Sequence, residues 1–378
     1  MNRYAASISQ HPVAAQAVGE LAGSVLEQLD GRTIDLVVGF VSPHFAGASE
    51  DIAGVLAAVL DPEVMVGSTN AAIIGSGREV EDGPAISVWA ASFDANTRVR
   101  AVDLDESPAD PTHSETRGSD DDHTLVLLAD PFTVPVEGLL RSISERTPDL
   151  QVIGGMASAA AGPGGNRIIL DGHARDHGAV GVVLAGSDPV TAVVSQGCRP
   201  VGQPFVVTDV DGHYVRGLGG RSALERLQEL AATMSEVERD QLQRGLHVGL
   251  VVDEHRVEFG REDFLIRGVM GARADDGAIA IGAQVEVGQT LQFHVRDAIA
   301  AGADLRAMLA GLNARAGLLF TCTGRGRRLF GTDGHDAAMV ADLLGPIPVA
   351  GGFCAGEIGP VGATNHIHGI TASLALFP

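Results

Sequence analysis

The stretch GGFCAGEIGPVG (residues 351–362) follows the apolar run IPVA and precedes the apolar run ITASLALF. Five of its twelve residues are glycine, which loses much conformational freedom on folding and is therefore concentrated where the backbone needs it. One thiol, Cys354, and one carboxylate, Glu357, lie among these glycines. An apolar strand that runs into a glycine-rich turn also occurs twice earlier in the chain, and this recurrence predicts the fold.

Two earlier stretches match this one in position and character. EVMVGSTNAAIIG (63–75) follows the apolar run DLVVGFV (35–41) and a helical stretch, and QVIGGMASAAAG (151–162) follows TLVLLAD (124–130) and another helical stretch. Short apolar runs rich in β-branched residues are typical of buried strands. The third occurrence begins with AGLLFTC (316–322). We therefore predict three repeated strand–helix–strand units, each completed by a further strand.

The other segments predict an α/β protein with mixed β-sheets flanked by helices in a layered sandwich, built as two packed modules. Val13–Leu29 has the apolar spacing of an amphipathic helix, and so has Ser222–Gly245, where we place the domain junction. Asp263–Asp297 alternates in the manner of strands joined by hairpins. The acidic, turn-rich segment Asp103–His123 predicts a solvent-exposed loop.

Composition restricts the classes of function. The chain has 378 residues and a net charge of −22, and this acidic balance disfavours nucleic acid and anionic membranes as partners. All 26 basic residues are arginine, so Schiff-base lysine chemistry and a P-loop lysine are excluded. The glycine-rich runs IIGSGREV and AGPGG do not open a helix of a dinucleotide-binding unit, so no cofactor is expected.

Cysteine usage and hydropathy predict a cytoplasmic protein. Three cysteines without a signal peptide indicate a reducing compartment. The apolar runs have the length of strands and fall well short of a membrane span, so no membrane insertion is expected.

Seven motifs occur together and in a fixed order: LADPF (128–132), VIGGMAS (152–158), SQGCRPVG (195–202), FLIRGVMG (264–271), QFHVRDA (292–298), FTCTGRG (320–326) and GFCAGEIGPVG (352–362). In this order and at this length the chain resembles the FIST family, the F-box and intracellular signal transduction proteins. The resemblance implies a FIST N-type domain over 35–230 and a FIST C-type domain over 246–378, after an N-terminal helix and lead-in over 1–34. It leaves no room for an F-box or a kinase domain, as in a stand-alone prokaryotic-type member.

The resemblance also implies a function. The family is associated with sensory input by small-molecule binding, with amino acids or related small carboxylates as favoured ligands. A stand-alone copy would signal through a separate protein or not at all. The composition leaves a homo-oligomer open.

Polar side chains at strand ends and glycine turns are the candidate ligand-binding residues, because such turns meet ligands at the surface. Arg199, beside Cys198, offers a planar fork of donors for a carboxylate, or else forms a structural salt bridge while Cys198 packs as a small apolar group. On a strand, Gln292, His294 and Arg296 share one face, which predicts a pocket wall. The next residue, an aspartate, is expected to cap a helix.

The candidate ligand-binding set is completed by residues of the last motifs: Cys322, Arg325, Cys354, Glu357, Asn365 and His368. Arg325 lies in a glycine turn that either binds an anion or is solvated and paired with surface carboxylates. We place the pocket mainly in the C-terminal module, closed by SQGCRPVG, with Arg199, Arg296, Arg325 and Glu357 converging on one cavity.

No catalytic residue and no metal site is predicted, since the sequence has no C-x-x-C pair and no nucleophile elbow. The alternative function is a cysteine-dependent or acid/base enzyme that acts on a small metabolite. It would use Cys322 or Cys354 together with Glu357.

Overall fold

The computed structural model describes residues 1–104, 122–186, 189–256 and 258–378. The described chain forms two compact units, and the chain passes between them more than once. Unit 1 consists of Met1–Ser195, Leu305–Ile367 and Thr371–Pro378, and unit 2 consists of Gln196–Asp304 and His368–Ile370. Most of the predicted acidic loop, residues 105–121, lies outside the described residues.

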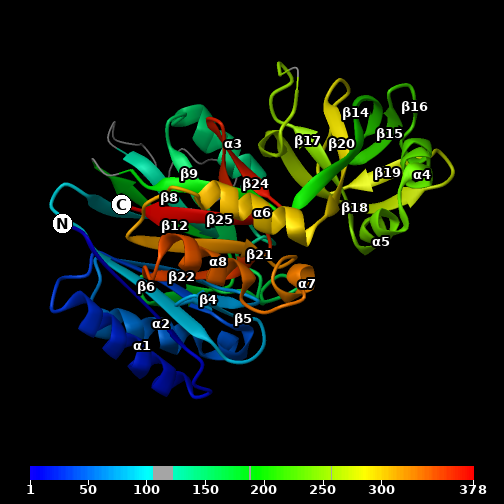
Figure 1. Ribbon diagram of the computed structural model, residues 1–378. Coiled ribbons are helices and arrows are strands. Elements are labelled where there is room, and N and C mark those ends of the chain that lie inside the picture. Colours follow the sequence, from blue (N-terminus) through cyan, green and yellow to red (C-terminus); the bar gives the residue numbers. More distant parts are fainter. Residues whose placement is uncertain (105–121, 187–188, 257) are drawn as a thin grey trace. The chain divides into compact units, whose positions relative to one another are not determined.

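Unit 1 is built on three six-stranded sheets within the described residues (Figure 1). Sheet 1 has the order β1 (Arg3–Ser9), β6 (Ile86–Ser92), β2 (Leu36–Val41), β3 (Val64–Thr69), β10 (Ile168–Leu170) and β11 (His173–Arg175). Sheet 2 has the order β24 (Thr364–His368), β23 (Glu357–Val361), β9 (Gln151–Met156), β8 (Asp122–Ala129), β12 (Ala179–Ala185) and β7 (Arg98–Asp103). Sheet 3 has the order β13 (Thr191–Gln196), β25 (Thr371–Phe377), β21 (Ala316–Cys322), β22 (Val349–Cys354), β4 (Ile73–Gly75) and β5 (Arg78–Val80).

The three sheets share one pattern, which confirms the predicted repeat. At the centre of each sheet two strands run parallel: β2 with β3, β8 with β9, and β21 with β22. A third strand then pairs antiparallel with the first of each pair, namely β6, β12 and β25. The predicted mixed α/β architecture is therefore confirmed.

The repeats exchange hairpins in a closed cycle. The hairpin β4–β5 of the first repeat pairs with β22 of the third, β10–β11 of the second pairs with β3 of the first, and β23 of the third pairs with β9 of the second. Each sheet is therefore completed by a hairpin from another repeat. Strand pairing between such distant segments follows no local sequence rule, so this exchange was not predicted.

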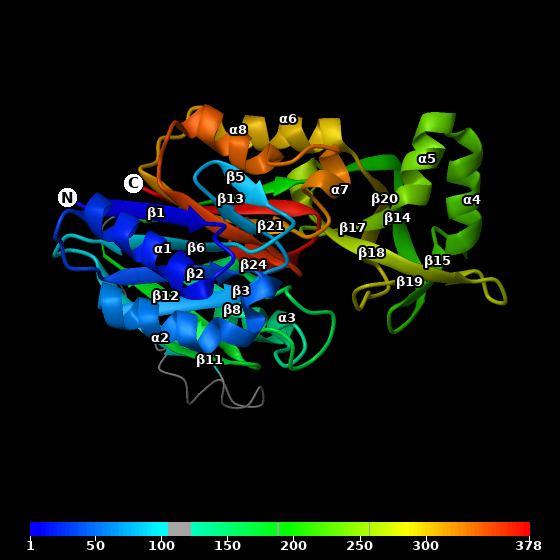
Figure 2. The same ribbon diagram turned by 90° about the horizontal axis from the view of Figure 1, so that it is seen from below.

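The inner faces of the three sheets form a common core, and helices cover their outer faces (Figure 2). Apolar side chains of α1 and α2 pack on sheet 1, those of α3 on sheet 2, and those of α8 and the end of α6 on sheet 3. The helices of this unit are α1 (Ala14–Leu29), the 3₁₀ helix η1 (Pro43–Ala48), α2 (Ser49–Leu60), α3 (Val136–Arg146), α6 (Ala298–Leu309, in part), α7 (Arg327–Phe330) and α8 (His335–Leu344).

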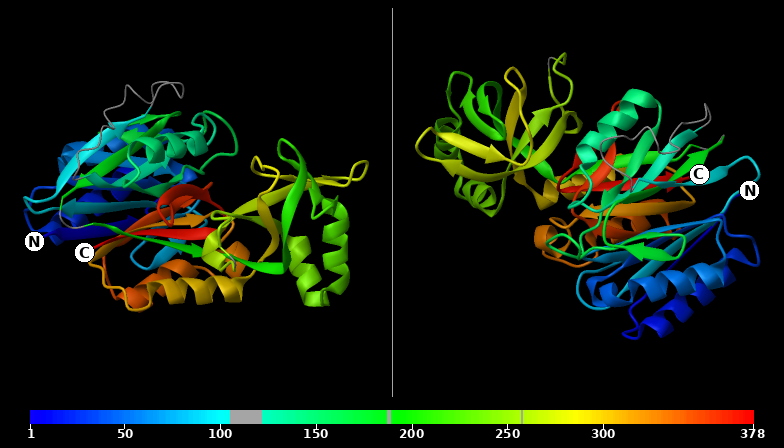
Figure 3. Two further views of the ribbon diagram at one scale, coloured as in Figure 1. Left: turned by 90° about the horizontal axis from the view of Figure 1, so that it is seen from above. Right: turned by 180° about the vertical axis from the view of Figure 1, so that it is seen from behind.

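The chain termini both belong to unit 1 and lie close together (Figure 3). The hydroxyl of Tyr4 donates a hydrogen bond to the carbonyl of Pro378 at 3.3 Å. Among the described helices, none combines the length and the apolar character needed to cross a membrane.

Unit 2 is a small antiparallel barrel. Its strands are β14 (Cys198–Asp211), β20 (Thr290–Arg296), β17 (Leu246–Val251), β18 (Phe264–Arg273), β19 (Ala278–Ile281), β15 (Tyr214–Leu218) and the short β16 (Arg221–Ser222). Because β14 pairs with both β20 and β15, the sheet closes on itself around an apolar core. The hairpins predicted in Asp263–Asp297 are part of this barrel.

The predicted helical region Ser222–Gly245 consists of two helices, α4 (Ala223–Thr233) and α5 (Glu236–Arg244). The break falls at Ser235, whose hydroxyl accepts a hydrogen bond from the N–H of Glu238 while the Glu238 carboxylate accepts one from the N–H of Ser235. This reciprocal capping box starts a new helix inside a continuous amphipathic pattern. Unit 2 also contains the 3₁₀ helix η2 (Arg261–Asp263).

Candidate functional site

The predicted site residues belong to two different units. Unit 2 contains Cys198, Arg199, Gln292, His294, Arg296 and His368, and unit 1 contains Cys322, Arg325, Cys354, Glu357 and Asn365. Neither unit by itself brings together Arg199, Arg296, Arg325 and Glu357, which were expected to converge on one cavity. Arg199 and Arg325 each pair with a carboxylate of their own unit.

In unit 1, Arg325 forms a buried ion pair. Its Nε lies 2.7 Å from Oδ2 of Asp336 and its Nη2 lies 2.8 Å from Oδ1, and both side chains are at most 1% exposed. The guanidinium carbon also lies 5.2 Å from the ring centre of Phe330. Arg325 is therefore neither solvated nor paired with a surface carboxylate, because its partner is buried with it. Arg327, which follows in the same segment, does pair with the exposed carboxylates of Asp82 and Asp333.

Asp336 was missed by the sequence analysis. Burial raises the pKa of this carboxyl, but the charge and hydrogen bonds of Arg325 outweigh burial and bring its pKa to about 2. The only sequence signal for Asp336 was its place in the first turn of the helix HDAAMVADLL, where a carboxylate is common for other reasons.

Glu357 interacts electrostatically with Arg325 of this ion pair, but its hydrogen bonds are to other residues. Its buried Oε2 accepts hydrogen bonds from the hydroxyl of Thr371 at 2.7 Å and from the N–H of Thr371 at 3.2 Å. Burial raises the pKa of Glu357 to about 8, although Thr371, the charge of Arg325 and the thiol of Cys322 all lower it. Near neutral pH this carboxyl can therefore take up or release a proton.

Cys322 and Cys354 are partners across the parallel strands β21 and β22. The N–H of Gly324 donates to Sγ of Cys322 at 3.4 Å, and Sγ of Cys354 donates to the carbonyl of Gly352 at 3.4 Å. Burial raises the pKa of Cys354 well above its ordinary value, and the charges of Glu357 and Cys322 raise it further. Since thiolates are the reactive form, Cys354 is not an activated nucleophile.

Asn365 has a structural role in sheet 2. Its Oδ1 accepts a hydrogen bond from the N–H of Val152 at 2.8 Å, and its Nδ2 donates to the carbonyl of Leu150 at 2.9 Å. These two bonds tie β24 to the start of β9, so both polar atoms of the amide are already used.

In unit 2 the face of β20 is as predicted: Phe293 and Val295 enter the barrel core, and the polar residues point the other way. Nε2 of Gln292 donates to the carbonyl of Gly202 at 2.7 Å. His294 is 1% exposed, and burial, assisted by His247 and Arg261, lowers its pKa to about 4. The imidazole is therefore neutral at pH 7.

The remaining predicted residues of unit 2 are largely covered. Cys198 is 1% exposed and lies opposite Arg296 across β14 and β20, which agrees with the interpretation of Cys198 as a packed apolar group. His368 is 2% exposed. Neither side chain has the exposure of a group that meets a ligand from solvent.

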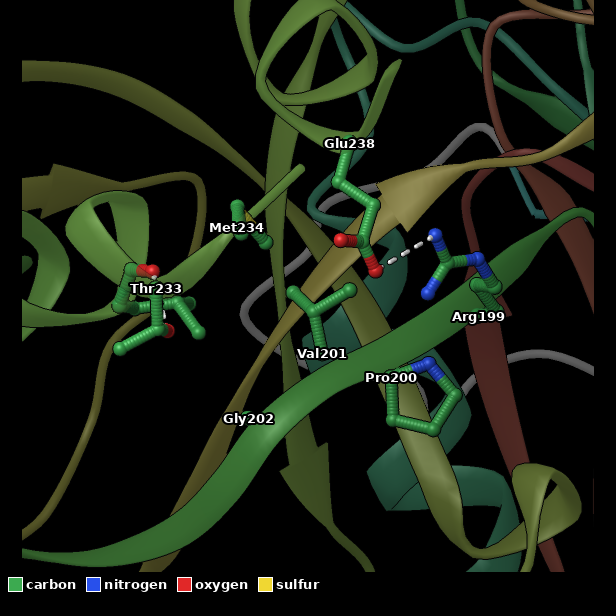
Figure 4. Close-up of a pocket in the computed structure, with 8 residues that line it drawn as sticks. Arg199, Pro200, Val201, Gly202, Thr233, Met234 and Glu238 are labelled. Atoms are coloured by element: carbon green, nitrogen blue, oxygen red, sulfur yellow. Dashed lines mark hydrogen bonds and ion pairs between the residues drawn. The ribbon is translucent and has the colours of Figure 1, made fainter. Parts of the chain in front are cut away.

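A pocket of about 250 Å³ opens beside Arg199 (Figure 4). Its lining comes from the start of β14, the end of α4 and the first turn of α5: Arg199, Pro200, Val201, Gly202, Leu230, Thr233, Met234 and Glu238. Only Arg199 of this set was predicted as a ligand-binding residue. Pro200, Val201 and Gly202 belong to the motif SQGCRPVG, which was expected to close the pocket. Leu230, Thr233, Met234 and Glu238 lie in the amphipathic helical region, whose pattern predicts packing and gives no signal for a pocket at the break between the helices.

The guanidinium of Arg199 is held in place by two partners. Its Nε donates to Oδ2 of Asp297 at 2.8 Å, and its Nη2 donates to Oε1 of Gln241 at 2.9 Å. Asp297 also accepts a hydrogen bond from the N–H of Ala300 at 2.9 Å, which confirms its expected role as a helix cap. The salt-bridge interpretation of Arg199 is thus supported.

Arg199 and Glu238 form the charged rim of this pocket. Nη2 of Arg199 lies 3.6 Å from Oε1 of Glu238, too long for a good hydrogen bond, and the two side chains are 25% and 37% exposed. Both charges are thus within reach of solvent and of a ligand, while Val201 lies beside them in Figure 4.

Comparison with known proteins extends over nearly the whole chain. The model of the FIST N domain matches residues 35–221, and the model of the FIST C domain matches residues 223–360. Uncharacterized protein Rv0628c of Mycobacterium tuberculosis (strain ATCC 25618 / H37Rv) is 41% identical over 382 residues, which is 99% of each chain. Uncharacterized protein Mb0898c of Mycobacterium bovis is 41% identical over 384 residues, which is 99% of this chain and 98% of its own.

The domain models and the mycobacterial relatives together show the family of the chain. FIST domains are associated with sensing in signal transduction. The two domain models together cover most of the chain, and the mycobacterial relatives align with almost all of it. The chain therefore belongs to the FIST family.

Proposed function

We propose that this protein is a small-molecule sensor of intracellular signalling whose ligand is a small α-amino acid, bound as a zwitterion in the pocket of unit 2. One observation carries the proposal: a cation and a carboxylate, Arg199 and Glu238, line a pocket together with the apolar side chains of Val201, Leu230 and Met234. Opposite charges next to apolar side chains complement the three parts of an amino acid.

Each part of the ligand has a counterpart in the pocket. The ligand carboxylate would accept hydrogen bonds from Arg199, whose planar fork of donors suits a carboxylate. The hydrogen bonds to Asp297 and Gln241 use Nε and Nη2, so we expect Nη1 to donate to the ligand. The ligand ammonium would donate to Glu238. An aliphatic side chain would then contact Leu230 and Met234.

The geometry of the rim favours exchange with such a ligand. The hydrogen bonds to Asp297 and Gln241 keep the guanidinium oriented before a ligand arrives, and preorganisation lowers the cost of binding. The 3.6 Å contact between Arg199 and Glu238 is an exposed ion pair, a type that contributes at most about 1 kcal/mol. A zwitterion that inserts between the two charges replaces a weak contact with two stronger ones.

Pocket size restricts the ligand further. Pockets for drug-sized ligands have volumes of about 300–1,000 Å³. At about 250 Å³ this pocket suits a smaller metabolite. We expect the ligand-bound state to be recognised by a separate signalling protein.

The proposal is tested by calorimetry and thermal shift with a panel of aliphatic α-amino acids. Each amino acid is compared with the amine that lacks its carboxylate and with its N-acetyl derivative. Only the zwitterions should bind and raise the melting temperature, by an amount that grows with ligand concentration. Equal binding of the amines, or no binding by any member of the panel to folded protein, would refute the proposal.

Two variants locate the site. Arg199→Gln and Glu238→Gln should each weaken binding at least about tenfold, which corresponds to loss of roughly 1.4 kcal/mol. Glutamine at 238 can still complete the capping box, so α5 should remain folded. The matched control is Arg216→Gln, which removes an arginine of unit 2 that pairs with Asp209 outside the pocket and should leave affinity unchanged.

A further inference from the structure

In unit 1, two thiols lie at the ends of neighbouring strands. Cys322 ends β21, Cys354 ends β22, and the two residues are partners in the parallel register. We propose that Cys322 and Cys354 are a redox-active pair that hydroperoxides oxidise to a disulfide, so that these residues form a modification site in sheet 3.

The strand geometry brings the two residues into the range of a disulfide. Neighbouring strands lie about 4.8 Å apart, and Cα atoms joined by a disulfide are about 4.4–6.8 Å apart. Partners in register project from the same face of a sheet. Cys354 lies in the central core together with Phe320, which precedes Cys322 by two residues and therefore shares its face.

Space for the Cys354 sulfur is created by a glycine of another sheet. A Cβ atom added to Gly155 would lie 2.3 Å from Sγ of Cys354, well inside van der Waals contact. Gly155 is the register partner of Glu357 in sheet 2. Any side chain at 155 would displace the thiol, so the fold accommodates this sulfur at the junction of the two sheets.

The surroundings of the two thiols suggest which one is oxidised first. Cys322 is 7% exposed and Cys354 is 1% exposed, so a small oxidant reaches Cys322 first. Sγ of Cys322 accepts the N–H of Gly324, and the positive charge of Arg325 interacts with it. Both contacts favour negative charge on this sulfur, as in reactive cysteines, whereas the hydrogen bond from the thiol to Glu357 favours the protonated form. Cys354 is the resolving thiol.

The chemistry balances with a hydroperoxide as the oxidant. The sulfur of Cys322 attacks the terminal peroxide oxygen; an S–O bond forms, the O–O bond breaks, and the alcohol, or water from hydrogen peroxide, leaves with the thiol proton. The sulfur of Cys354 then displaces the hydroxyl group from the Cys322 sulfenic acid, and its proton leaves in the water formed. Two thiols are oxidised and one peroxide is reduced.

The full chain is treated with hydrogen peroxide and then alkylated, digested and examined by mass spectrometry without reductant. We expect a peptide pair linked through Cys322 and Cys354 that lacks two hydrogen atoms and is separated again by dithiothreitol. Cys198, which is as buried as Cys354 but lies in unit 2, should stay a thiol and serves as the internal control.

Two serine variants assign the order of events. In Cys354→Ser, Cys322 should accumulate a sulfenic acid that a dione probe captures, and in Cys322→Ser, Cys354 should stay reduced. Circular dichroism checks that both variants are folded. Stepwise oxidation of Cys322 to a sulfinic acid in the wild type while Cys354 remains a thiol would overturn the proposal. So would the absence of thiol loss in folded protein under conditions that oxidise the urea-unfolded chain.

Discussion

Two fully buried carboxyl groups of unit 1 show how a single partner decides ionisation. Asp336 faces the guanidinium of Arg325 in a two-bond contact, and its pKa is about 2. Glu357 accepts hydrogen bonds from the hydroxyl and the backbone N–H of Thr371 and from the thiol of Cys322, none of which is a cation, and its pKa is about 8. Burial penalises both charges, but only Asp336 has a bonded cation to compensate.

Glu357→Gln is expected to make the stability of the protein less dependent on pH. The folded-state pKa of about 8 exceeds the ordinary value of 4.5, so the folded state binds the proton more tightly. The stabilising contribution of Glu357 is therefore complete below about pH 4.5 and is lost as pH rises through 8. Because one pKa unit corresponds to about 1.4 kcal/mol, the variant should gain several kcal/mol over wild type between pH 5 and pH 9.

Urea unfolding of both proteins across this pH range measures the difference. Some pH dependence should remain in the variant, because burial also raises the pKa of Glu79 to about 7, with the same sign. Identical pH slopes for Glu357→Gln and wild type would show that Glu357 is already ionised in the folded protein.

At the residue level, the sequence predicted which residues belong to a polar site better than it predicted their partners. Cys354 and Glu357 were selected because they interrupt a glycine run, and Cys322 because it ends a strand; all three lie in one buried cluster. Asp336 and Glu238 were not selected, because each occupies the first turn of a helix, where acidic residues are common. Their partners, Arg325 and Arg199, lie outside the helix that carries the carboxylate, so the pattern of that helix does not reveal them.

At the level of strands, the glycines of the repeat have a common cause. In each repeat a glycine of the second parallel strand passes close to a carbonyl of the first. An added Cβ would lie 2.7 Å from the Gly39 oxygen at Gly67, 1.9 Å from the Leu127 oxygen at Gly154, and 1.8 Å from the Leu319 oxygen at Gly351. The recurring glycine in the sequence is thus required by the close approach of paired strands.

Gly351→Ala should therefore destabilise the protein by at least about 3 kcal/mol, the upper end for overpacking, because the obstacle is backbone that cannot rotate away. Gly23→Ala is the matched control: it lies inside α1, and nothing approaches its added Cβ within 4 Å. Alanine there should stabilise the helix by about 0.5–1 kcal/mol. Denaturant unfolding of both variants measures these changes, and an equal effect of the two substitutions would contradict the steric explanation.

The positions of the strands were readily predicted, but the break between α4 and α5 was not. Apolar runs of strand length located β2, β8 and β21 because buried parallel strands are apolar on both faces. The break between α4 and α5 was missed because the amphipathic pattern continues through Ser235. The pocket of unit 2 opens at this break, so half of its lining residues, those of α4, α5 and the residues between them, were missed for the same reason.

At the scale of the whole unit, the exchange of hairpins makes the three repeats interdependent. Sheet 1 needs β10–β11 of the second repeat, sheet 2 needs β23–β24 of the third, and sheet 3 needs β4–β5 of the first. The sequence predicted three similar repeats, but similarity alone is equally compatible with three sheets that each use their own hairpin. The choice between these arrangements rests on contacts between segments hundreds of residues apart, such as the pairing of Ile73 with Gly352.

This interdependence predicts that a local defect in sheet 3 weakens all three sheets equally. Asp336→Asn leaves Arg325 buried without its counter-charge, and breaking a buried pair in this way costs about 3–5 kcal/mol. Amide hydrogen exchange in β2 and β8 should then accelerate by the same factor as in β21, because none of the three sheets is complete when another opens. Arg327→Gln is the control: its partners Asp82 and Asp333 are exposed, so it should cost less than about 1 kcal/mol and leave exchange nearly unchanged. Faster exchange confined to β21, β22 and β25 would instead mean that sheet 3 opens alone and that the exchanged hairpins do not couple the repeats.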